Sequence, residues 1–289
     1  MPMSLSLILN AFPMDSPFYL FMHIPKTAGT TFRSIVDKQY GFPNVLTYYN
    51  QNSTQLLDNL EATLQVGSHD YRALIGHFQY GVHAPLTRPS KYITFLRNPV
   101  ERAISSYHEN VKIMSPAVRD GNGELMSFGE CLREREEFFA NQQTKMISGK
   151  GSMEPVDASD LERAQKNIQK DFMFIGISEY FDASILLLSR LIHWRPCTYG
   201  KLNARSNKGR LDGQELFNLQ KINHFDAILY KNALDDLLRD MRGAGKKFDA
   251  ALAELAQSTS VAAVTGTQAA HALSDDHFAI KSFIGFAEN

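Results

Sequence analysis

The stretch Phe18-Tyr-Leu-Phe-Met-His-Ile-Pro-Lys-Thr-Ala-Gly-Thr-Thr-Phe32 decides the fold class of this chain. Residues 18–24 are apolar and rich in aromatic side chains, which predicts a buried β-strand. Pro25 ends that strand, and apolar residues then recur at helical spacing, which predicts a helix over residues 30–40. A buried strand that leads through a short polar loop into a helix is typical of α/β folds that bind anions at the loop.

The loop between this strand and this helix carries groups that bind a phosphate-like anion. Backbone N–H groups at a helix start attract negative charge, and a lysine ammonium and threonine hydroxyls add to that attraction. Thr30 or Thr31 is the expected N-cap of the helix. The loop is not a Walker A motif, because its lysine precedes the glycine instead of following it. The candidate anion-binding residues are Lys26, Thr27, Ala28, Gly29, Thr30 and Thr31.

A second junction of this kind follows residues 91–96, which read Lys-Tyr-Ile-Thr-Phe-Leu and predict another buried strand. Arg97 comes directly after this strand. Asn98 is a suitable N-cap and Pro99 suits the first helical position, so a helix is expected over residues 99–113. Ligands bind at the carboxyl ends of strands in doubly wound α/β folds, and a guanidinium can form two hydrogen bonds to one phosphate. Arg97 is therefore a candidate anion ligand.

The two junctions together resemble the nucleotide-binding motifs of PAPS-dependent sulfotransferases. The order His-Ile-Pro-Lys-Thr-Ala-Gly-Thr-Thr-Phe is similar to the 5′-phosphosulfate loop of the carbohydrate branch, which includes the heparan sulfate 2-O-sulfotransferases. Arg97, followed eight residues later by Ser105, is similar to the 3′-phosphate motif of the same family. The resemblance implies that PAPS (3′-phosphoadenosine 5′-phosphosulfate) is the donor, that PAP is the product, and that Arg97 and Ser105 bind the 3′-phosphate.

Weaker matches extend the resemblance over residues 18–242, at 141–149, 174–182 and 222–230. The family has a basic loop that closes over the nucleotide where this chain has residues 203–209. The resemblance therefore adds Arg205 and Lys208 to the expected donor contacts. An ordinary solvated loop is the alternative interpretation of these two residues.

The segment Ala73-Leu-Ile-Gly-His77 predicts a short strand followed by a histidine. A histidine at the carboxyl end of a strand, opposite an anion-binding loop, is well placed as a general base, because its ordinary pKa of about 6.5 is close to neutral pH. The Gly-His pair also matches the position of the catalytic histidine in the 2-O-sulfotransferase branch, so the resemblance implies that role for His77. His83 is the rival base and Glu109 a distant alternative, whereas His23 is expected to be structural.

Composition excludes a general nucleic-acid-binding protein, because 30 basic and 31 acidic residues give a net charge of −1. Any positive cleft would have to be local, with Lys26, Arg97, Arg102, Arg205, Lys208 and Arg210 as its candidates. The two cysteines, Cys131 and Cys197, cannot make a disulfide framework and have no metal-ligand spacing, which indicates a reducing compartment and no metal site.

The sequence also bears on location. It has no signal-peptide pattern and no apolar run long enough to cross a membrane. The eukaryotic enzymes that the motifs resemble are typically Golgi proteins with a membrane anchor. We therefore expect a soluble bacterial enzyme of the cytoplasm, without a transmembrane segment.

Strands alternate with helices along the chain, which predicts an α/β fold with a P-loop-like parallel sheet flanked by helices, the sulfotransferase fold. The remaining expected elements are a strand at 172–177 and helices at 54–64, 127–147, 159–170, 182–193 and 214–242, the last broken near Asn223. We expect one large sulfotransferase domain over residues 1–256, followed by a linker and C-terminal tail over residues 257–289.

These observations favour a sulfotransferase of the EC 2.8.2 type that moves a sulfuryl group in line from PAPS to a hydroxyl of a carbohydrate or glycoconjugate. His77 would remove the hydroxyl proton, Lys26 would neutralise charge on the leaving nucleotide, and no metal is required. The acceptor is open between a polysaccharide, a glycolipid head group and a small hydroxylated metabolite, and so is the oligomeric state. A catalytically inactive nucleotide-binding module and an atypical P-loop ATP phosphotransferase are the alternatives.

Overall fold

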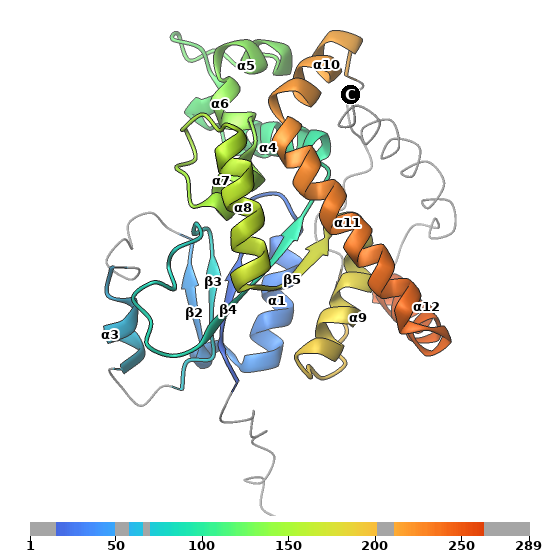
Figure 1. The fold of residues 1–289 in the computed structure, drawn as a ribbon. Helices are drawn as coiled ribbons and strands as arrows, with labels where there is room; N and C mark the ends of the chain where they lie inside the picture. The colour runs from blue at the N-terminus through green and yellow to red at the C-terminus, as the bar shows by residue number, and fades with distance from the viewer. Residues whose placement is uncertain (1–15, 50–57, 66–69, 201–210, 263–289) are drawn as a thin grey trace, which may run out of the picture.

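The computed structural model describes residues 16–49, 58–65, 70–200 and 211–262 (Figure 1). Its centre is a five-stranded sheet in the order β2-β3-β1-β4-β5, in which every neighbouring pair of strands is parallel. The predicted α/β fold, a parallel sheet flanked by helices, is confirmed. The strands are β1 (Phe18–Met22), β2 (Val45–Tyr48), β3 (Ala73–Gly76), β4 (Ser90–Leu96) and β5 (Phe172–Ile177).

Helices cover both faces of the sheet, as expected for parallel strands whose side chains are apolar on both sides. All five residues of β1 are buried, and successive residues enter opposite cores. Leu20 and Met22 pack toward α8 and α11, whereas Tyr19 and Phe21 pack toward α1 and α9. These helices are α1 (Gly29–Tyr40), α8 (Ala158–Asp171), α9 (Phe181–Leu191) and α11 (His224–Ala244).

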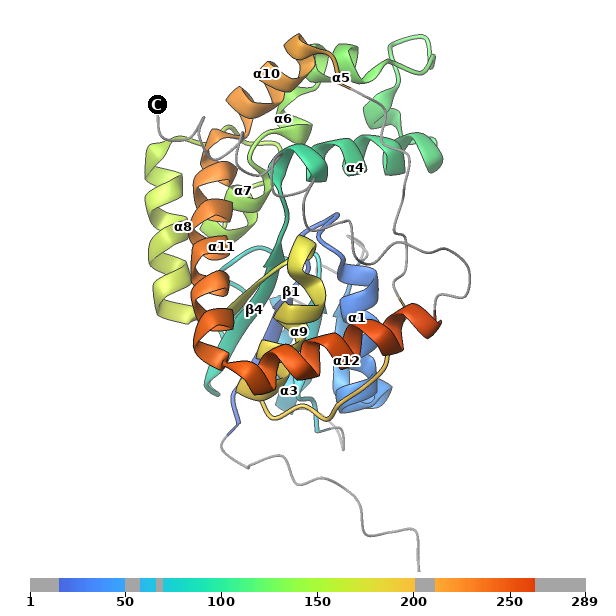
Figure 2. The same cartoon turned by 90° about the vertical axis from the view of Figure 1, so that its right-hand side faces the viewer.

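A third group of helices lies beyond the carboxyl ends of the strands (Figures 1 and 2). These helices share a core of their own, which includes Ala103, Leu132 and Leu219. The group consists of α4 (Pro99–Lys112), α5 (Phe128–Glu134), α6 (Glu136–Phe139) and α10 (Gly213–Ile222). The short helix α7 (Gln142–Ser148) packs on α8 and α11 and so connects this group to the sheet.

The structure changes the predicted elements in two places. Strand β2 was missed, because four residues that closely follow Pro43 are too short a run to stand out in the sequence. The predicted helix over 127–147 is wrong, since the chain forms α5, α6 and α7 there. Arg135 leaves the helical conformation (φ −134°) and Asn141 is left-handed (φ 46°), and each interrupts the helix. The predicted break near Asn223 is confirmed, since it separates α10 from α11.

The remaining helices are α3 (Leu60–Gln65), α12 (Lys246–Ala262) and the 3-10 helices η1 (Phe42–Asn44), η3 (Pro116–Val118) and η4 (Ser178–Tyr180). Helix α12 includes residues 257–262, so the expected domain boundary at 256 falls inside a helix. The rest of the expected linker and tail lies outside the described residues. Within the described ranges, no helix has the length and hydropathy that a membrane span requires.

Candidate functional site

The candidate residues meet at the carboxyl edge of the sheet, where β3, β1 and β4 end beside one another. Met22 of β1 pairs with Gly76 of β3 and with Thr94 of β4, so the three strands are in register near their ends. This edge is the ligand-binding edge of open α/β sheets. The groups that follow the three strands are the lysine loop (residues 23–29), His77 and Arg97.

The lysine loop is a tight turn with two residues in the left-handed backbone conformation, Lys26 (φ 73°) and Ala28 (φ 67°). Thr27 lies between them and is buried. Its hydroxyl donates to the carbonyl of Ile24 at 2.8 Å. The Thr27 hydroxyl hydrogen is therefore used inside the turn, which it stabilises.

Helix α1 begins at Gly29, one or two residues earlier than the expected cap. Its N-cap is Ala28, which has no side-chain acceptor for the first amides of the helix. The expectation that Thr30 or Thr31 caps the helix is therefore wrong. Both threonines lie in the first turn instead, with Thr30 exposed and Thr31 buried.

Arg97 joins the two junctions. Its Nη1 donates to the carbonyl of Lys26 at 3.0 Å, and its Nη2 lies 3.6 Å from the carboxylate of Glu101. Asn98 caps α4 as predicted, because its Oδ1 accepts the N–H groups of Val100 at 3.0 Å and of Glu101 at 3.3 Å. The structure therefore brings the two sequence motifs into direct contact.

One face of α4 presents a row of polar side chains to this region. Glu101, Ser105 and Glu109 are four residues apart and lie on the same side of the helix. Glu109 pairs with Lys26, with 3.4 Å between Oε2 and Nζ, just as Glu101 pairs with Arg97. Each of the two cations therefore has a carboxylate beside it.

Glu179 is a site residue that sequence reasoning missed. It follows β5 at the same edge of the sheet, and its Oε1 accepts the N–H of Asn98 at 2.9 Å. Its Oε2 accepts the hydroxyl of Tyr230 at 3.2 Å. Burial raises the pKa of Glu179, and the Asn98 hydrogen bond opposes that shift. The available signal in the sequence is the predicted strand at 172–177 followed by Ser-Glu-Tyr, within the segment 174–182 that resembles the family.

His77 lies beside His23 because each is one residue beyond the Met22–Gly76 pair. The Nδ1 atom of His77 lies 2.7 Å from the carbonyl oxygen of His23. A carbonyl can only accept, so Nδ1 carries the proton and Nε2 is the basic nitrogen. The side chain is exposed at the edge of the sheet. Desolvation by the surrounding protein lowers the pKa of His77, and the hydrogen bond to the carbonyl opposes that shift.

His23 packs inside the lysine loop and supports both Gly29 and His77. A Cβ atom at Gly29 would lie only 1.6 Å from His23 Nε2, so this position must be glycine. The ring of His23 lies 4.4 Å from that of His77, and its Nδ1 lies 3.2 Å from the Tyr49 hydroxyl. Burial, and then the charge of His77, lower the pKa of His23 to about 3, so this ring is neutral at pH 7.

His83 lies away from this edge, near the start of β4 and β5. Its Nδ1 is 2.8 Å from the Tyr92 hydroxyl, and its Nε2 is 3.5 Å from the carboxylate of Asp171. Both ring nitrogens of His83 thus have partners. Of the two rival histidines, His77 is the one placed beside the lysine loop.

The expected positive cleft needs one correction. Arg102 is only 1% exposed, and its Nη2 donates to the carbonyl of Phe139 at 2.8 Å. It therefore belongs to the core, and its inclusion in the cleft was wrong. The expected contacts Arg205 and Lys208, together with Arg210, lie outside the described residues.

A family model described as galactose-3-O-sulfotransferase matches residues 13–282, a range that contains both junctions and every candidate site residue. The chain belongs to this family. The expectation of a carbohydrate sulfotransferase family is confirmed, although the matching model is the galactose 3-O family and not the 2-O branch whose motifs we compared.

Relatives from both branches are similar to parts of the chain. Heparan sulfate 2-O-sulfotransferase hst-2 of Caenorhabditis elegans is 29% identical over 147 residues, which are 42% of each protein. Human galactose-3-O-sulfotransferase 3 is 32% identical over 133 residues, 42% of this chain and 30% of the relative. Mouse galactose-3-O-sulfotransferase 2 is 24% identical over 213 residues, which cover 65% of this chain and 52% of the relative. The chain thus matches about half or less of the length of these curated relatives.

Two solved sulfotransferases also align with the chain. The enzyme from Alicyclobacillus acidocaldarius is 12% identical with a TM-score of 0.42, over 75% of this chain and 95% of that one. A mouse sulfotransferase complexed with PAP is 13% identical with a TM-score of 0.35, over 82% of this chain and 88% of that one. Both TM-scores lie below 0.5, so neither alignment locates the site.

Proposed function

We propose that this protein is a sulfotransferase that uses PAPS as its donor and a carbohydrate hydroxyl as its acceptor. One observation carries the proposal: Arg97 donates to the carbonyl of Lys26 at 3.0 Å, at the same sheet edge where His77 lies. Two candidate anion-binding junctions and a candidate base thus come from separate parts of the chain to one edge of the sheet. Membership of the galactose-3-O-sulfotransferase family supports the reaction class.

The described residues suit a ligand with two anionic groups. Lys26 and the first amides of α1 would bind the 5′-phosphosulfate, with the Thr30 hydroxyl exposed beside them. Arg97 and Ser105 would bind the 3′-phosphate, since a guanidinium fork suits a phosphate. Glu109 and Glu101 lie beside the two cations, so a bound ligand would compete with these carboxylates for Lys26 and Arg97. PAPS would supply an activated sulfuryl group.

His77 is the proposed general base. Its Nε2 takes the proton of the acceptor hydroxyl, which makes that oxygen nucleophilic. The hydrogen bond from Nδ1 to the His23 carbonyl orients the ring and stabilises the imidazolium that forms. Lys26 donates to the oxygens on which negative charge develops, so it acts mainly by electrostatic stabilisation.

Calorimetric titration with PAP, 5′-AMP and ATP tests the donor site without knowledge of the acceptor. Wild-type protein should bind PAP best. Arg97→Ala should weaken PAP binding on the order of 10²-fold and change 5′-AMP binding little, because a charged hydrogen-bonding partner of the 3′-phosphate is lost. Lys91→Ala, which changes a lysine whose ammonium donates to the Lys170 carbonyl, is the control.

The same titration separates the alternative functions. Better binding of ATP than of PAP would favour a phosphotransferase and overturn the proposal. PAP binding without sulfuryl transfer to any member of a glycan panel would favour an inactive nucleotide-binding module. The proposed acceptor class follows from the family alone, and the cytoplasmic location and bacterial origin stay predictions.

A further inference from the structure

The side chain of Gln143 makes two hydrogen bonds to the backbone of one donor-site residue. The N–H of Arg97 donates to Gln143 Oε1 at 2.9 Å, and Gln143 Nε2 donates to the Arg97 carbonyl at 2.9 Å. Arg97 is the first residue after β4, where the strand's own ladder has ended. The Gln143 amide therefore fixes the peptide groups on both sides of the Arg97 Cα. Its side chain is completely buried.

Gln143 is itself fixed by α11. Asp226 accepts the N–H groups of Gln143 at 3.1 Å and of Thr144 at 2.7 Å, together with the Thr144 hydroxyl at 2.8 Å. The exchange is reciprocal, because Asn141 Oδ1 accepts the N–H groups of Phe225 and Asp226, each at 3.1 Å. The start of each helix is thus capped by the other.

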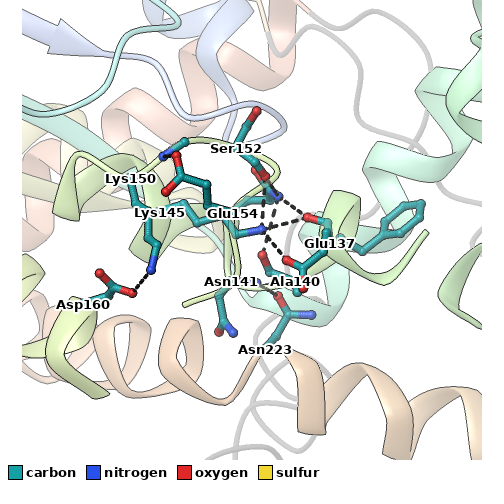
Figure 3. A network of polar contacts seen from close by, with 12 residues as sticks. Glu137, Ala140, Asn141, Lys145, Lys150, Ser152, Glu154, Asp160 and Asn223 are labelled. Carbon is teal, nitrogen blue, oxygen red and sulfur yellow. Dashed lines mark hydrogen bonds and ion pairs between the residues drawn. The ribbon is translucent and has the colours of Figure 1, made fainter. Parts of the chain in front are cut away.

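A further bond closes this junction, since the N–H of Asn141 donates to Asn223 Oδ1 at 2.9 Å (Figure 3). Gln143, Thr144, Asn223 and Asp226 are all fully buried. Buried polar groups that are fully paired specify one arrangement, because every alternative leaves a group unpaired. The α7–α11 junction therefore has one favoured geometry, and Gln143 transmits it to Arg97.

The neighbouring glutamine is different. Gln142 Nε2 donates to the carbonyls of Glu137 at 2.8 Å and Ser152 at 2.9 Å. Lys145 donates to the same two carbonyls, so these contacts belong to a network that attaches the loop after α7 (Figure 3). Two adjacent glutamines of one short helix thus have separate partners, and only one of them contacts Arg97.

We propose that Gln143 is a positioning residue for Arg97, and that it determines how well the site discriminates a 3′-phosphorylated nucleotide from one without that phosphate. The inference rests on the proposed function, because it assigns Arg97 to the 3′-phosphate. In this proposal the Arg97 guanidinium contacts the 3′-phosphate. Gln143 orients the Arg97 backbone from which that side chain extends.

The measurement is the ratio of the dissociation constants for 5′-AMP and PAP, determined by calorimetry in wild type, Gln143→Leu and Gln142→Leu. Leucine preserves much of the side-chain volume and removes the side-chain hydrogen bonds, two at Gln143 and three at Gln142. Gln143→Leu should lower the ratio about tenfold through weaker PAP binding, the size expected for mispairing one or two buried groups. Gln142→Leu should leave the ratio within about twofold of wild type, since its hydrogen bonds go to the carbonyls of Glu137, Ala140 and Ser152 and not to Arg97.

Two further variants exclude a merely structural effect. In an Arg97→Ala background, Gln143→Leu should not lower the ratio further, because the residue that it positions is gone. Gln143→Glu keeps the acceptor for the Arg97 N–H and loses the donor, so it should give an intermediate ratio and serves if the leucine variant does not fold. Equal weakening of both nucleotides, or an unchanged ratio in both Gln143 variants, would overturn the inference alone. A wild type without preference for PAP would overturn the proposed function with it.

Discussion

Lys26 and Arg97 lie at the same edge of the sheet and within one hydrogen bond of each other, yet they differ in what surrounds them. Lys26 projects from a left-handed turn, and its ammonium contacts a half-exposed carboxylate, that of Glu109. Arg97 has its backbone fixed by Gln143, and the next peptide N–H is bound by Glu179. An exposed ion pair contributes about 1 kcal/mol or less, whereas unpairing a buried polar group costs about 1–3 kcal/mol.

The difference indicates a division of work within the proposed donor site. A fixed arginine suits recognition of a phosphate that does not change during the reaction. An adjustable lysine suits the group on which charge develops, because it can follow the oxygens into the transition state. Four substitutions test this division. Lys26→Ala removes the lysine, and Asp226→Ala disrupts the junction that supports Arg97. His23→Asn and Glu109→Gln change the surroundings of Lys26.

Lys26→Ala should have the largest effect, a loss of about 10²–10³ in turnover, because it removes a contact that is strongest in the transition state. PAP affinity should fall by less than tenfold, since the product lacks the transferred group. The assay is sulfuryl transfer from labelled PAPS to galactose-containing glycans. Lys112→Ala, an exposed lysine at the end of α4, is the control. Equal losses in turnover and PAP affinity would contradict an adjustable, transition-state role.

Asp226→Ala should lower the free energy of unfolding by about 3 kcal/mol, because three buried donors at the start of α7 lose their acceptor. Asp236→Ala on the same helix α11 is the matched control, since its carboxylate is exposed and pairs with the exposed Arg239. That control should stay within about 0.5 kcal/mol of wild type. Urea denaturation of wild type and both variants measures the free energy of unfolding. Similar losses in both variants would show that the α7–α11 junction does not fix the backbone of Arg97.

Local patterns in the sequence predicted much of the fold and the nearest parts of the site. The strands at 18–24 and 91–96, the Asn98 cap and the histidine after β3 all depend on neighbours a few residues away. The predicted start of α1 was too late, because the left-handed turn at Lys26 and Ala28 lets the helix begin at Gly29. The sequence does not signal that turn, since neither residue is the glycine or asparagine that usually adopts a left-handed conformation.

The supporting groups could not be predicted, because their partners are distant in sequence. Gln143 meets Arg97 across 46 residues, and Glu179 meets Asn98 across 81. The sequence pattern places Asn141 inside one long helix, since nothing local shows that its side chain caps α11. The fixed side of the site is therefore the side that sequence reasoning missed.

The lysine loop should make the protein sensitive to acid through His23. Its pKa of about 3 in the folded protein lies below the ordinary value of 6.5, so the unfolded chain binds this proton first as pH falls. Stability from this group is complete above pH 6.5 and decreases by about 1.4 kcal/mol per pH unit below it. Between pH 6.5 and 4.5 the loss should be about 2–3 kcal/mol.

His23→Asn removes this titration while keeping a short polar side chain beside Tyr49. The free energy of unfolding should therefore fall less steeply with decreasing pH in the variant than in wild type. The slopes are compared, and not the absolute stabilities, because the substitution also leaves space beneath Gly29. Parallel slopes would mean that His23 is not held neutral in the folded protein.

Glu109→Gln should have the smallest effect and the most specific sign. Its carboxylate competes with a ligand anion for Lys26, so removing the charge should strengthen PAP binding about three- to fivefold at low ionic strength. The gain should shrink in high salt, because both groups of the pair are partly exposed. Glu124→Gln, which removes one negative charge at another exposed position, is the control and should leave PAP binding unchanged. Weaker PAP binding in Glu109→Gln would mean that Glu109 orients Lys26 for the ligand, and the lysine would then be as firmly positioned as the arginine.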